Sequence, residues 1–104
     1  MFLWIDDIRT PPCDDWLWAR SVNEAITAIK SYERSFATDT IYISLDHDAG
    51  DFGSDGGDYI RVLDWLEQAG IVDTGYFFHL HTQNPVGREN MERIIRKNGW
   101  RLVR

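Results

Sequence analysis

Acidic, histidine and amide side chains follow three apolar segments of this sequence. The three polar clusters are Asp6-Asp7, Asp46-His47-Asp48 and His81-Thr82-Gln83-Asn84. Carboxylate oxygens are ligands that Mg²⁺ prefers, and imidazole, with an unperturbed pKa of about 6.5, transfers protons near neutral pH. If the fold brings these clusters together, they could hold a divalent cation beside a group that moves protons.

The size and composition of the chain indicate one acidic globular domain. The sequence has 104 residues, of which 43% are hydrophobic, and five tryptophans, which excludes a disordered chain. The formal net charge of −6 argues against generic or duplex nucleic-acid binding. It does not exclude a small phosphorylated ligand, because a divalent cation can supply positive charge.

Cysteine usage and hydropathy bear on the compartment. Cys13 is the only cysteine, so an intrachain disulfide is impossible, which fits a reducing compartment. No apolar run approaches the roughly 20 residues of a membrane span, and no signal-peptide pattern opens the chain. We therefore expect a cytoplasmic domain with no membrane partner.

The apolar periodicity predicts the element order β, β, α, β, α, β, α, β. Strands are expected at residues 1–6, 16–19, 41–46, 76–82 and 100–103, and helices at 22–34, from Tyr59 to Gly70 and from about Gly87 to Asn98. Ser21 and Glu24 form a capping box before the first helix. Strands that alternate with helices imply a mainly parallel sheet. Ligands bind at the carboxyl ends of such strands, where the three polar clusters should meet.

This arrangement resembles the receiver domain of response regulators. There an acidic pair ends the first strand, a phosphate-accepting aspartate ends the third, and Thr or Ser ends the fourth. Asp6 and Asp7, Asp46, and Thr82 match these positions. The resemblance implies an α/β, receiver-like (flavodoxin-like) fold with a mainly parallel five-stranded sheet in the order 2-1-3-4-5.

Finer motifs resemble a narrower family, the cyclic-phosphate-processing receiver-like domains. The motifs are Leu3-Trp4-Ile5-Asp6-Asp7-Ile8-Arg9-Thr10-Pro11, Ser44-Leu45-Asp46-His47-Asp48 and His81-Thr82-Gln83-Asn84-Pro85-Val86-Gly87-Arg88-Glu89-Asn90-Met91. With the intervening elements they span nearly the whole chain, residues 1–104, as a single domain.

The sequence departs from an ordinary receiver in its helices and in one lysine. Residues 7–15 are too few for the usual crossover helix, and no final helix or lysine follows the fifth strand. We therefore expect the first and last helices to be missing and the remaining three to cover one sheet face. Because a buried parallel sheet needs both faces covered, other groups must shield the second face. The candidates are the proline loop, the tryptophans Trp4, Trp16, Trp18 and Trp100, or a second subunit, and we predict a homodimer.

Three aspartates are the candidate metal ligands. Asp6, Asp7 and Asp46 should meet on neighbouring strand ends and hold Mg²⁺ or another divalent cation. Asp46 is either the nucleophile that forms an aspartyl-phosphate or a metal ligand only. The plain alternative is that these acids are solvated loop residues.

The remaining candidates have roles in proton transfer, phosphate binding and support. His81 is the expected general acid or base, and the alternative is a core histidine. Thr82, the next residue, is a further catalytic candidate that should orient phosphate oxygens. Phosphate binding is expected from Arg9, Asn84 and Arg88, which could instead be a salt-bridge partner, a helix cap and a solvated arginine. Supporting positions without direct ligand contact are His47, Asp48 and His79. The glycine-rich loop at residues 50–57 is either a flap beside the site or a plain surface loop.

Two functional hypotheses follow, together with a third possibility. The preferred one is metal-dependent hydrolysis of a cyclic phosphate on a nucleotide or RNA end, in which only the resemblance supplies the word "cyclic". The alternative is a non-catalytic receiver-like module that accepts a phosphoryl group or senses a nucleotide. The third is an interaction domain that uses its bare sheet face.

Overall fold

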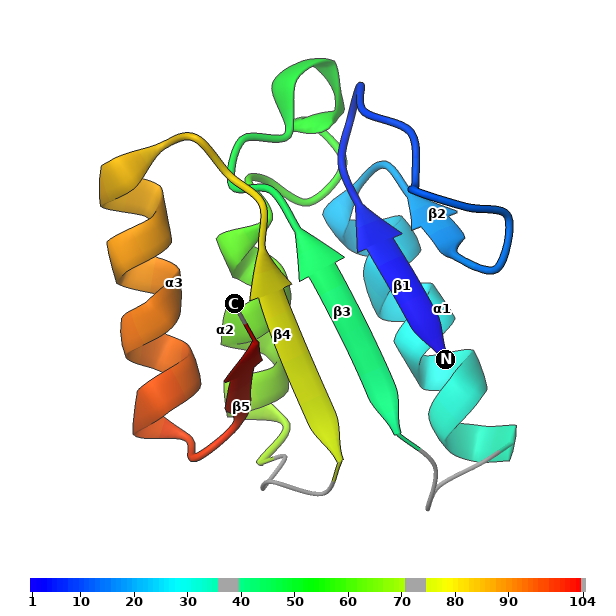
Figure 1. The fold of residues 1–104 in the computed structure, drawn as a ribbon, viewed down its shortest axis with the longest axis vertical. Helices are drawn as coiled ribbons and strands as arrows, with labels where there is room; N and C mark the ends of the chain where they lie inside the picture. The colour runs from blue at the N-terminus through cyan, green and yellow to red at the C-terminus, as the bar shows by residue number, and fades with distance from the viewer. Residues whose placement is uncertain (36–39, 71–74, 104) are drawn as a thin grey trace.

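Five parallel strands form the central sheet, in the order β2-β1-β3-β4-β5 (Figure 1). The computed structural model describes residues 1–35, 40–70 and 75–103. The strands are β1 (Phe2–Ile5), β2 (Leu17–Ala19), β3 (Ile41–Leu45), β4 (Tyr76–Leu80) and β5 (Arg101–Val103). Every neighbouring pair is parallel, which confirms the expected receiver-like topology.

Three α-helices and one 3₁₀ turn complete the described chain. They are α1 (Val22–Ser35), α2 (Ile60–Gln68), α3 (Pro85–Lys97) and η1 (Gly50–Phe52). The helix expected from Gly87 begins two residues earlier, at Pro85, because proline lacks an N–H and suits the first helical position. Ser21 Oγ accepts the N–H of Glu24 as predicted, but the Glu24 carboxylate accepts the N–H of Arg20 rather than that of Ser21.

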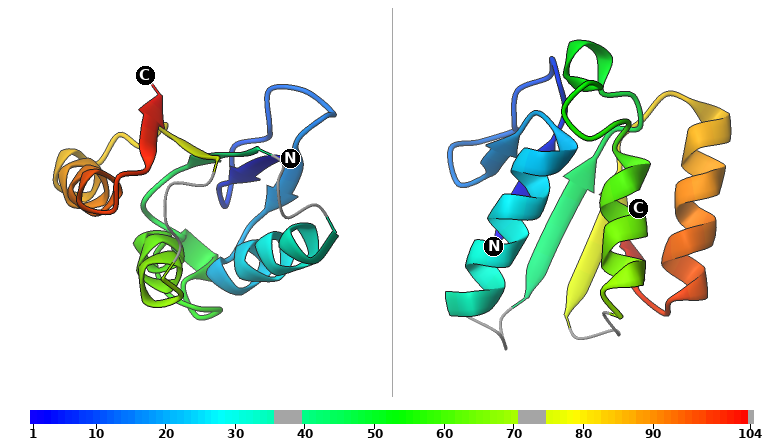
Figure 2. Two further views of the ribbon diagram at one scale, coloured as in Figure 1. Left: turned by 90° about the horizontal axis from the view of Figure 1, so that it is seen from below. Right: turned by 180° about the vertical axis from the view of Figure 1, so that it is seen from behind.

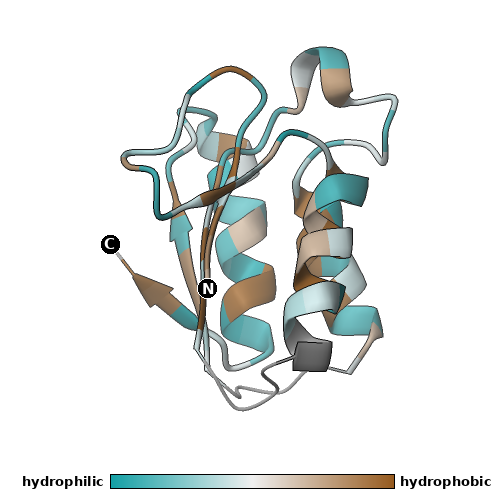
Figure 3. Ribbon diagram, turned by 90° about the vertical axis from the view of Figure 1, so that its right-hand side faces the viewer, coloured by the Kyte–Doolittle hydropathy of each residue, from teal (hydrophilic) through white to brown (hydrophobic). Residues whose placement is uncertain are grey.

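The three helices lie on one side of the sheet (Figure 2). The connections β2→β3, β3→β4 and β4→β5 all move in the same direction across the sheet, so right-handed crossovers must use the same face. That face holds the fully buried core, which includes Leu3, Ile43, Leu63 and Phe78. The helices mix hydrophobic and hydrophilic residues along their length, as amphipathic helices do (Figure 3).

The β1→β2 connection runs in the opposite direction and crosses the other face of the sheet, which we call the open face. Residues 7–16 contain no helix there. Instead the Trp16 ring packs against Phe2, Trp4 and Tyr42, with ring centroids 5.2, 5.7 and 5.6 Å away. The proline loop thus covers part of the face that a receiver's first helix would cover.

Trp100 does not belong to this cover. It is only 4% exposed and its ring lies 5.4 Å from that of Phe78, on the helix side of the sheet. The expectation that Trp100 shields the open face was therefore wrong. The next residue, Arg101, lies opposite Phe77 on the open face, and successive side chains of an extended chain point to opposite sides of the sheet. The homodimer remains a prediction. Within the described residues, no helix has both the length and the apolar character needed to cross a membrane.

Candidate metal and proton-transfer site

Three carboxylates meet at the carboxyl edge of the sheet. Asp6 follows β1, Asp46 follows β3, and Asp7 is the next residue after Asp6; one ligand oxygen of each lies within 4.8 Å of those of the other two. The parallel register places the aspartates together, because Ile5 lies opposite Leu45 and the Asp46 N–H donates to the Ile5 carbonyl at 3.0 Å. The predicted convergence of the first two polar clusters is present.

Asp6 is a buried carboxylate with well-defined partners. It is 1% exposed, and its Oδ1 accepts the N–H groups of Ile8 and Arg9, both at 2.9 Å. Its Oδ2 lies 2.9 Å from His81 Nε2. Burial by itself would raise the pKa of Asp6, but these hydrogen bonds and the nearby imidazole outweigh it and lower the pKa. Asp6 is therefore a fixed negative charge that also shapes the turn after β1.

Asp7 differs from Asp6 in that its pKa is raised and not lowered. Burial raises its pKa, and the negative charges of Asp6 and Asp46 raise it further. A cation among the three carboxylates would relieve this repulsion. The candidate ligand atoms are all carboxylate oxygens, and Mg²⁺ and Ca²⁺ prefer oxygen ligands. The residues present therefore fit a hard divalent cation.

Gly50 allows the Asp7 carboxylate to take this position. Its φ of +55° lies in the left-handed region, and a Cβ added there would collide with Asp7 Oδ2. The glycine-rich loop therefore contacts the acid cluster directly, which favours its prediction as a segment beside the site over a plain surface loop.

We expect Gly50→Ala to weaken Mg²⁺ binding about 10- to 100-fold, because the new methyl group displaces the Asp7 carboxylate, one of the three candidate ligands. Isothermal titration calorimetry measures this. Gly70→Ala is the matched control, since Gly70 also has a positive φ (+73°) but nothing within 4 Å of its Cβ position. Equal loss of metal affinity in both variants would contradict the role assigned to Gly50.

Arg20 fixes the backbone of Asp7 from the end of β2. Its Nε and Nη2 donate to the Asp7 carbonyl at 3.0 and 2.7 Å. The guanidinium lies between the rings of Trp18 and Phe52, 4.9 and 4.7 Å from their centroids. Trp18 Nε1 in turn donates to the Asp6 carbonyl at 2.8 Å. Arg20 was not among the site residues predicted from the sequence, although its place directly after a strand was the available signal.

Tyr59 lies behind the acid cluster. It is fully buried and its hydroxyl donates to the Arg20 carbonyl at 2.7 Å. Burial raises its pKa strongly, and the charges of Asp7, Asp6 and Asp46 add to the effect. Tyr59 therefore stays neutral, and its hydroxyl supports the backbone that carries Arg20.

A chain of hydrogen bonds leads from Asp6 through His81 to His79. His81 Nδ1 lies 2.9 Å from Ser44 Oγ, and Ser44 Oγ lies 2.9 Å from His79 Nδ1. Ionised Asp6 can only accept, so the His81 proton is on Nε2 and Nδ1 accepts from the Ser44 hydroxyl. Ser44 then accepts from His79 Nδ1–H. Burial lowers the pKa of His81, and this effect outweighs the hydrogen bond and the negative charge of Asp6, which raise the pKa. The lowered pKa keeps the imidazole ring neutral.

Ser44 also explains how His81 reaches the acids. In the register, Ser44 lies between Trp4 on β1 and His79 on β4, on the open face. Its small side chain leaves space for the Trp4 and His81 rings to stack above β3, with centroids 4.0 Å apart and planes at 4°. Neither Ser44 nor Trp4 was predicted from the sequence as a contact of His81. A serine inside an apolar strand was the signal for Ser44.

Ser44→Ala should lower the free energy of unfolding by about 1–3 kcal/mol, because two imidazole nitrogens lose their partner in a largely buried place. Ser44 itself is 1% exposed. Chemical denaturation measures the loss, and ¹⁵N chemical shifts of the imidazoles should report a changed tautomer balance at His79. An unchanged His79 spectrum would show that the chain of hydrogen bonds is absent in solution.

The predicted phosphate-binding residues all touch the segment after β4. Arg9 Nη1 donates to the His81 carbonyl at 3.2 Å, and Arg88 Nη2 donates to the Thr82 carbonyl at 2.9 Å. Thr82 is buried, and its Oγ1 accepts the N–H of Asn84 at 3.1 Å. Asn84 caps α3, with its Oδ1 accepting from Gly87 N–H at 3.0 Å. Phosphate binding by these residues remains a prediction.

His47 and Asp48 lie beside the acids and pair with each other. His47 Nδ1 is 2.7 Å from Asp48 Oδ1, and the His47 N–H donates to Asp46 Oδ1 at 2.7 Å. A Cβ on Gly87 would overlap the His47 ring, so the ring packs directly on the first turn of α3. His47 and Asp48 form a further acidic group with Asp58. They support the strand end, and a ligand role for them remains a prediction.

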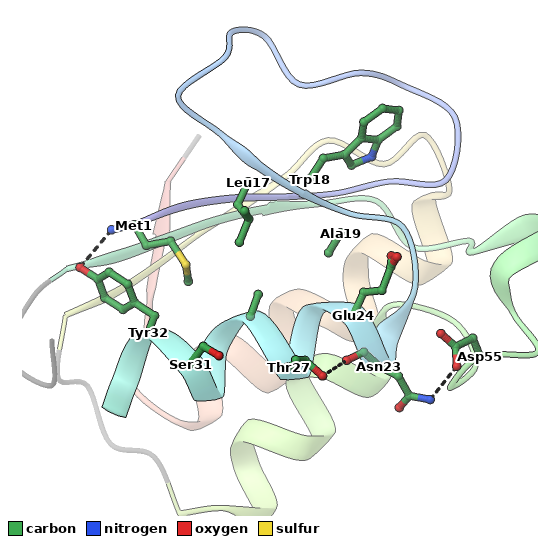
Figure 4. A pocket seen from close by; sticks show the side chains of 11 residues that line it. Met1, Leu17, Trp18, Ala19, Asn23, Glu24, Thr27, Ser31, Tyr32 and Asp55 are labelled. Atoms are coloured by element: carbon green, nitrogen blue, oxygen red, sulfur yellow. Dashed lines mark hydrogen bonds between the residues drawn. The ribbon is translucent and has the colours of Figure 1, made fainter. Parts of the chain in front are cut away.

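A groove lined by the residues of Figure 4 lies elsewhere, between β2 and α1. It has a volume of about 730 Å³, and Leu17, Ala19 and Thr27 are among its lining residues. None of the three clustered aspartates and neither histidine of the hydrogen-bond chain lines it. We therefore place the chemistry at the sheet edge and not in this groove.

A parallel 2-1-3-4-5 sheet with acids at the ends of its first and third strands defines a receiver-like domain. The model of a family described as "Cyclic-phosphate processing Receiver domain" matches residues 1–97. The chain belongs to that family. No curated protein and no solved structure matches it.

Proposed function

We propose that this domain is a metal-dependent phosphoesterase that opens a cyclic phosphate on a nucleotide or an RNA end. The observation that supports this most is the buried Asp6 carboxylate, which belongs to the three-acid cluster and also holds His81 Nε2 at 2.9 Å. One residue thus joins a candidate cation site to a candidate proton donor. The reduced state expected of Cys13 favours the cytoplasm as its compartment.

In this proposal the aspartates hold Mg²⁺, with Asp6, Asp7 and Asp46 as its ligands. The ion, when bound, neutralises the phosphate oxygens and polarises the phosphorus. Asp46 either ligates the ion or attacks phosphorus itself. Arg9 and Arg88 supply guanidinium groups near the 81–82 segment, where they can orient further phosphate oxygens.

His81 supplies the proton that hydrolysis requires. Hydrolysis adds one water: its oxygen forms the new P–O bond, one P–O bond of the ring breaks, and the leaving oxygen takes the Nε2 proton of His81. The proton that the water loses passes to solvent, and a proton returns to His81 Nδ1 through His79 and Ser44, so the imidazole ends neutral. The His81 Nε2–H is directed toward the acid cluster, where Asp6 accepts it. The leaving oxygen replaces Asp6 as acceptor, and the stacked Trp4 ring keeps the imidazole in place during the exchange.

One observation favours the alternative, a nucleotide sensor without turnover. Both His81 ring nitrogens already have hydrogen-bond partners, Asp6 and Ser44. In this arrangement neither ring nitrogen of His81 is free to accept a proton from water. A domain that binds a cyclic nucleotide and only reports it would have no need for such a base.

A panel of 2′,3′-cyclic and 3′,5′-cyclic nucleotides separates the two functions. Each nucleotide is incubated with the protein and Mg²⁺, binding is measured by calorimetry, and products are separated by chromatography. Turnover of at least one cyclic phosphate, lost in Asp46→Asn, supports the enzyme. Binding without turnover supports the sensor. If no nucleotide is bound or turned over, both proposed functions are contradicted.

Asp7 makes a testable contribution to the pH dependence of stability. Its pKa is raised in the folded state, so folding takes up a proton between the ordinary aspartate pKa and the raised one. Without metal, the free energy of unfolding should therefore fall as pH rises through that window. Asp7→Asn should remove the fall and stabilise the metal-free protein at neutral pH by up to about 1 kcal/mol, since solvent screens these charges.

Denaturation curves with EDTA at pH 4, 5.5 and 7 measure this. The difference between wild type and Asp7→Asn isolates Asp7 from the opposite trend expected for Asp6. Saturating Mg²⁺ should reverse the order and make the wild type more stable at neutral pH. A variant that is less stable than wild type in EDTA would contradict the repulsion among the three acids.

A further inference from the structure

The open face of the sheet presents aromatic rings that lead to the candidate site. Trp4 stacks on His81, Trp16 contacts Trp4, and Phe2 and Tyr42 contact Trp16 at 5.2 and 5.6 Å. Phe2 is 49% exposed. The ring cluster therefore extends without interruption from the proposed proton donor toward the start of β1.

The strands of the sheet differ in charge from the whole protein. None of the five described strands contains an aspartate or glutamate, despite the net charge of −6. The Arg101 guanidinium lies 5.5 Å from the Phe77 centroid on the same face. Arg9 lies at the opposite end, where its carbonyl accepts the Trp4 indole N–H at 2.8 Å. The strands thus offer aromatic rings between two cations.

We propose that the open face binds the last few nucleotides of a single-stranded RNA whose terminal cyclic phosphate occupies the acid–histidine site. This deepens the proposed function, on which it rests, by naming a polynucleotide as the substrate. A 2′,3′-cyclic phosphate requires a ribose 2′-hydroxyl, so the chain that carries it is RNA. Aromatic side chains on an exposed sheet face stack two or three bases in other RNA-binding folds, and Arg supplements them.

A second copy of the chain fits the face less well than RNA does. A stable interface buries about 800 Å² from each partner, and such a patch would be contiguous and apolar. The exposed large hydrophobic side chains of the described chain are instead scattered: Phe2, Ile8, Leu17 and Val86. Of these four residues, only Phe2 belongs to the aromatic cluster. The centre of the cluster is already covered by Trp16 of the proline loop.

The test compares binding of uridine 3′-monophosphate with binding of tetrauridylate that ends in a 3′-phosphate. These probes resemble the product, so their affinities are measured by tryptophan fluorescence without any need for turnover. The tetranucleotide should bind about tenfold more tightly or better. Phe2→Ala and Phe2→Leu should both lose most of this advantage, because leucine keeps apolar area but no ring. Leu17→Ala, which removes an exposed side chain on the other side of the sheet, should retain it.

Three outcomes would overturn or separate the claims. Equal affinity for the two probes would overturn the RNA surface, even if cyclic mononucleotides are hydrolysed. If light scattering shows a dimer and Phe2→Ala dissociates it, the open face is an interface between two copies of the chain, and the proposal of an RNA surface is overturned. A tetranucleotide preference that depends on Phe2, without turnover of any cyclic phosphate, would support the RNA surface while the phosphoesterase fails.

Discussion

Asp46→Asn should reduce kcat for a cyclic phosphate about 10²- to 10³-fold, the loss typical of removing one strong electrostatic group from a reacting centre. The variant keeps the shape of the side chain and an oxygen that can accept the His47 N–H, which donates to Asp46 Oδ1 at 2.7 Å in the wild type. The fold should therefore survive, and circular dichroism checks this. Asp64→Asn on the exposed side of α2 is the control that should leave kcat unchanged.

The same variant series distinguishes the two roles left open for Asp46. If Asp46 is the nucleophile, its attack on phosphorus opens the ring and leaves the nucleotide esterified to its carboxylate, and mass spectrometry of protein quenched with acid during turnover detects this adduct. If Asp46 is only a ligand, no adduct forms, and Asp46→Asn weakens Mg²⁺ binding in calorimetry. Retention of full activity by Asp46→Asn would contradict both roles.

His81→Gln should lower kcat about 10²- to 10⁴-fold, the range expected for loss of a general acid or base. Glutamine can still donate an N–H to Asp6, so the buried carboxylate keeps a partner while the ionisable ring is lost. Mg²⁺ affinity should therefore change little. A pH–rate profile should lose the limb that His81 contributes.

Two results would count against this role of His81. One is a kcat close to that of the wild type, which would leave the imidazole as a structural group stacked on Trp4. The other is a loss of Mg²⁺ affinity equal to the loss of kcat, which would mean that His81 acts only by orienting Asp6. His81→Ala serves as the harsher comparison, because it also removes the ring that Trp4 contacts at 4.0 Å.

The sheet and the acid cluster could be predicted from the sequence because both follow from short-range signals. Apolar runs predicted the strands, and acids follow two of these runs. Three crossovers that run in the same direction across the sheet place all three helices on one face. The parallel register then brings Asp6 and Asp46 together without any knowledge of side-chain packing.

Contacts that depend on packing were harder to predict. The stacking of His81 on Trp4 requires a small residue on β3 between them, and a serine inside an apolar strand marks that position without revealing which rings meet above it. Arg20 reaches Asp7 only because two aromatic rings hold its guanidinium. Trp100 was misplaced because its burial against Phe78 depends on the approach of the chain to β5.

The most direct test of the central claim is ³¹P NMR of uridine 2′,3′-cyclic phosphate mixed with the protein. With Mg²⁺, the cyclic-phosphate signal should be replaced by that of one phosphate monoester, and EDTA should stop the conversion. A panel of cyclic phosphates that all stay intact with Mg²⁺, at protein concentrations where calorimetry shows the ion bound, would contradict a metal-dependent phosphoesterase.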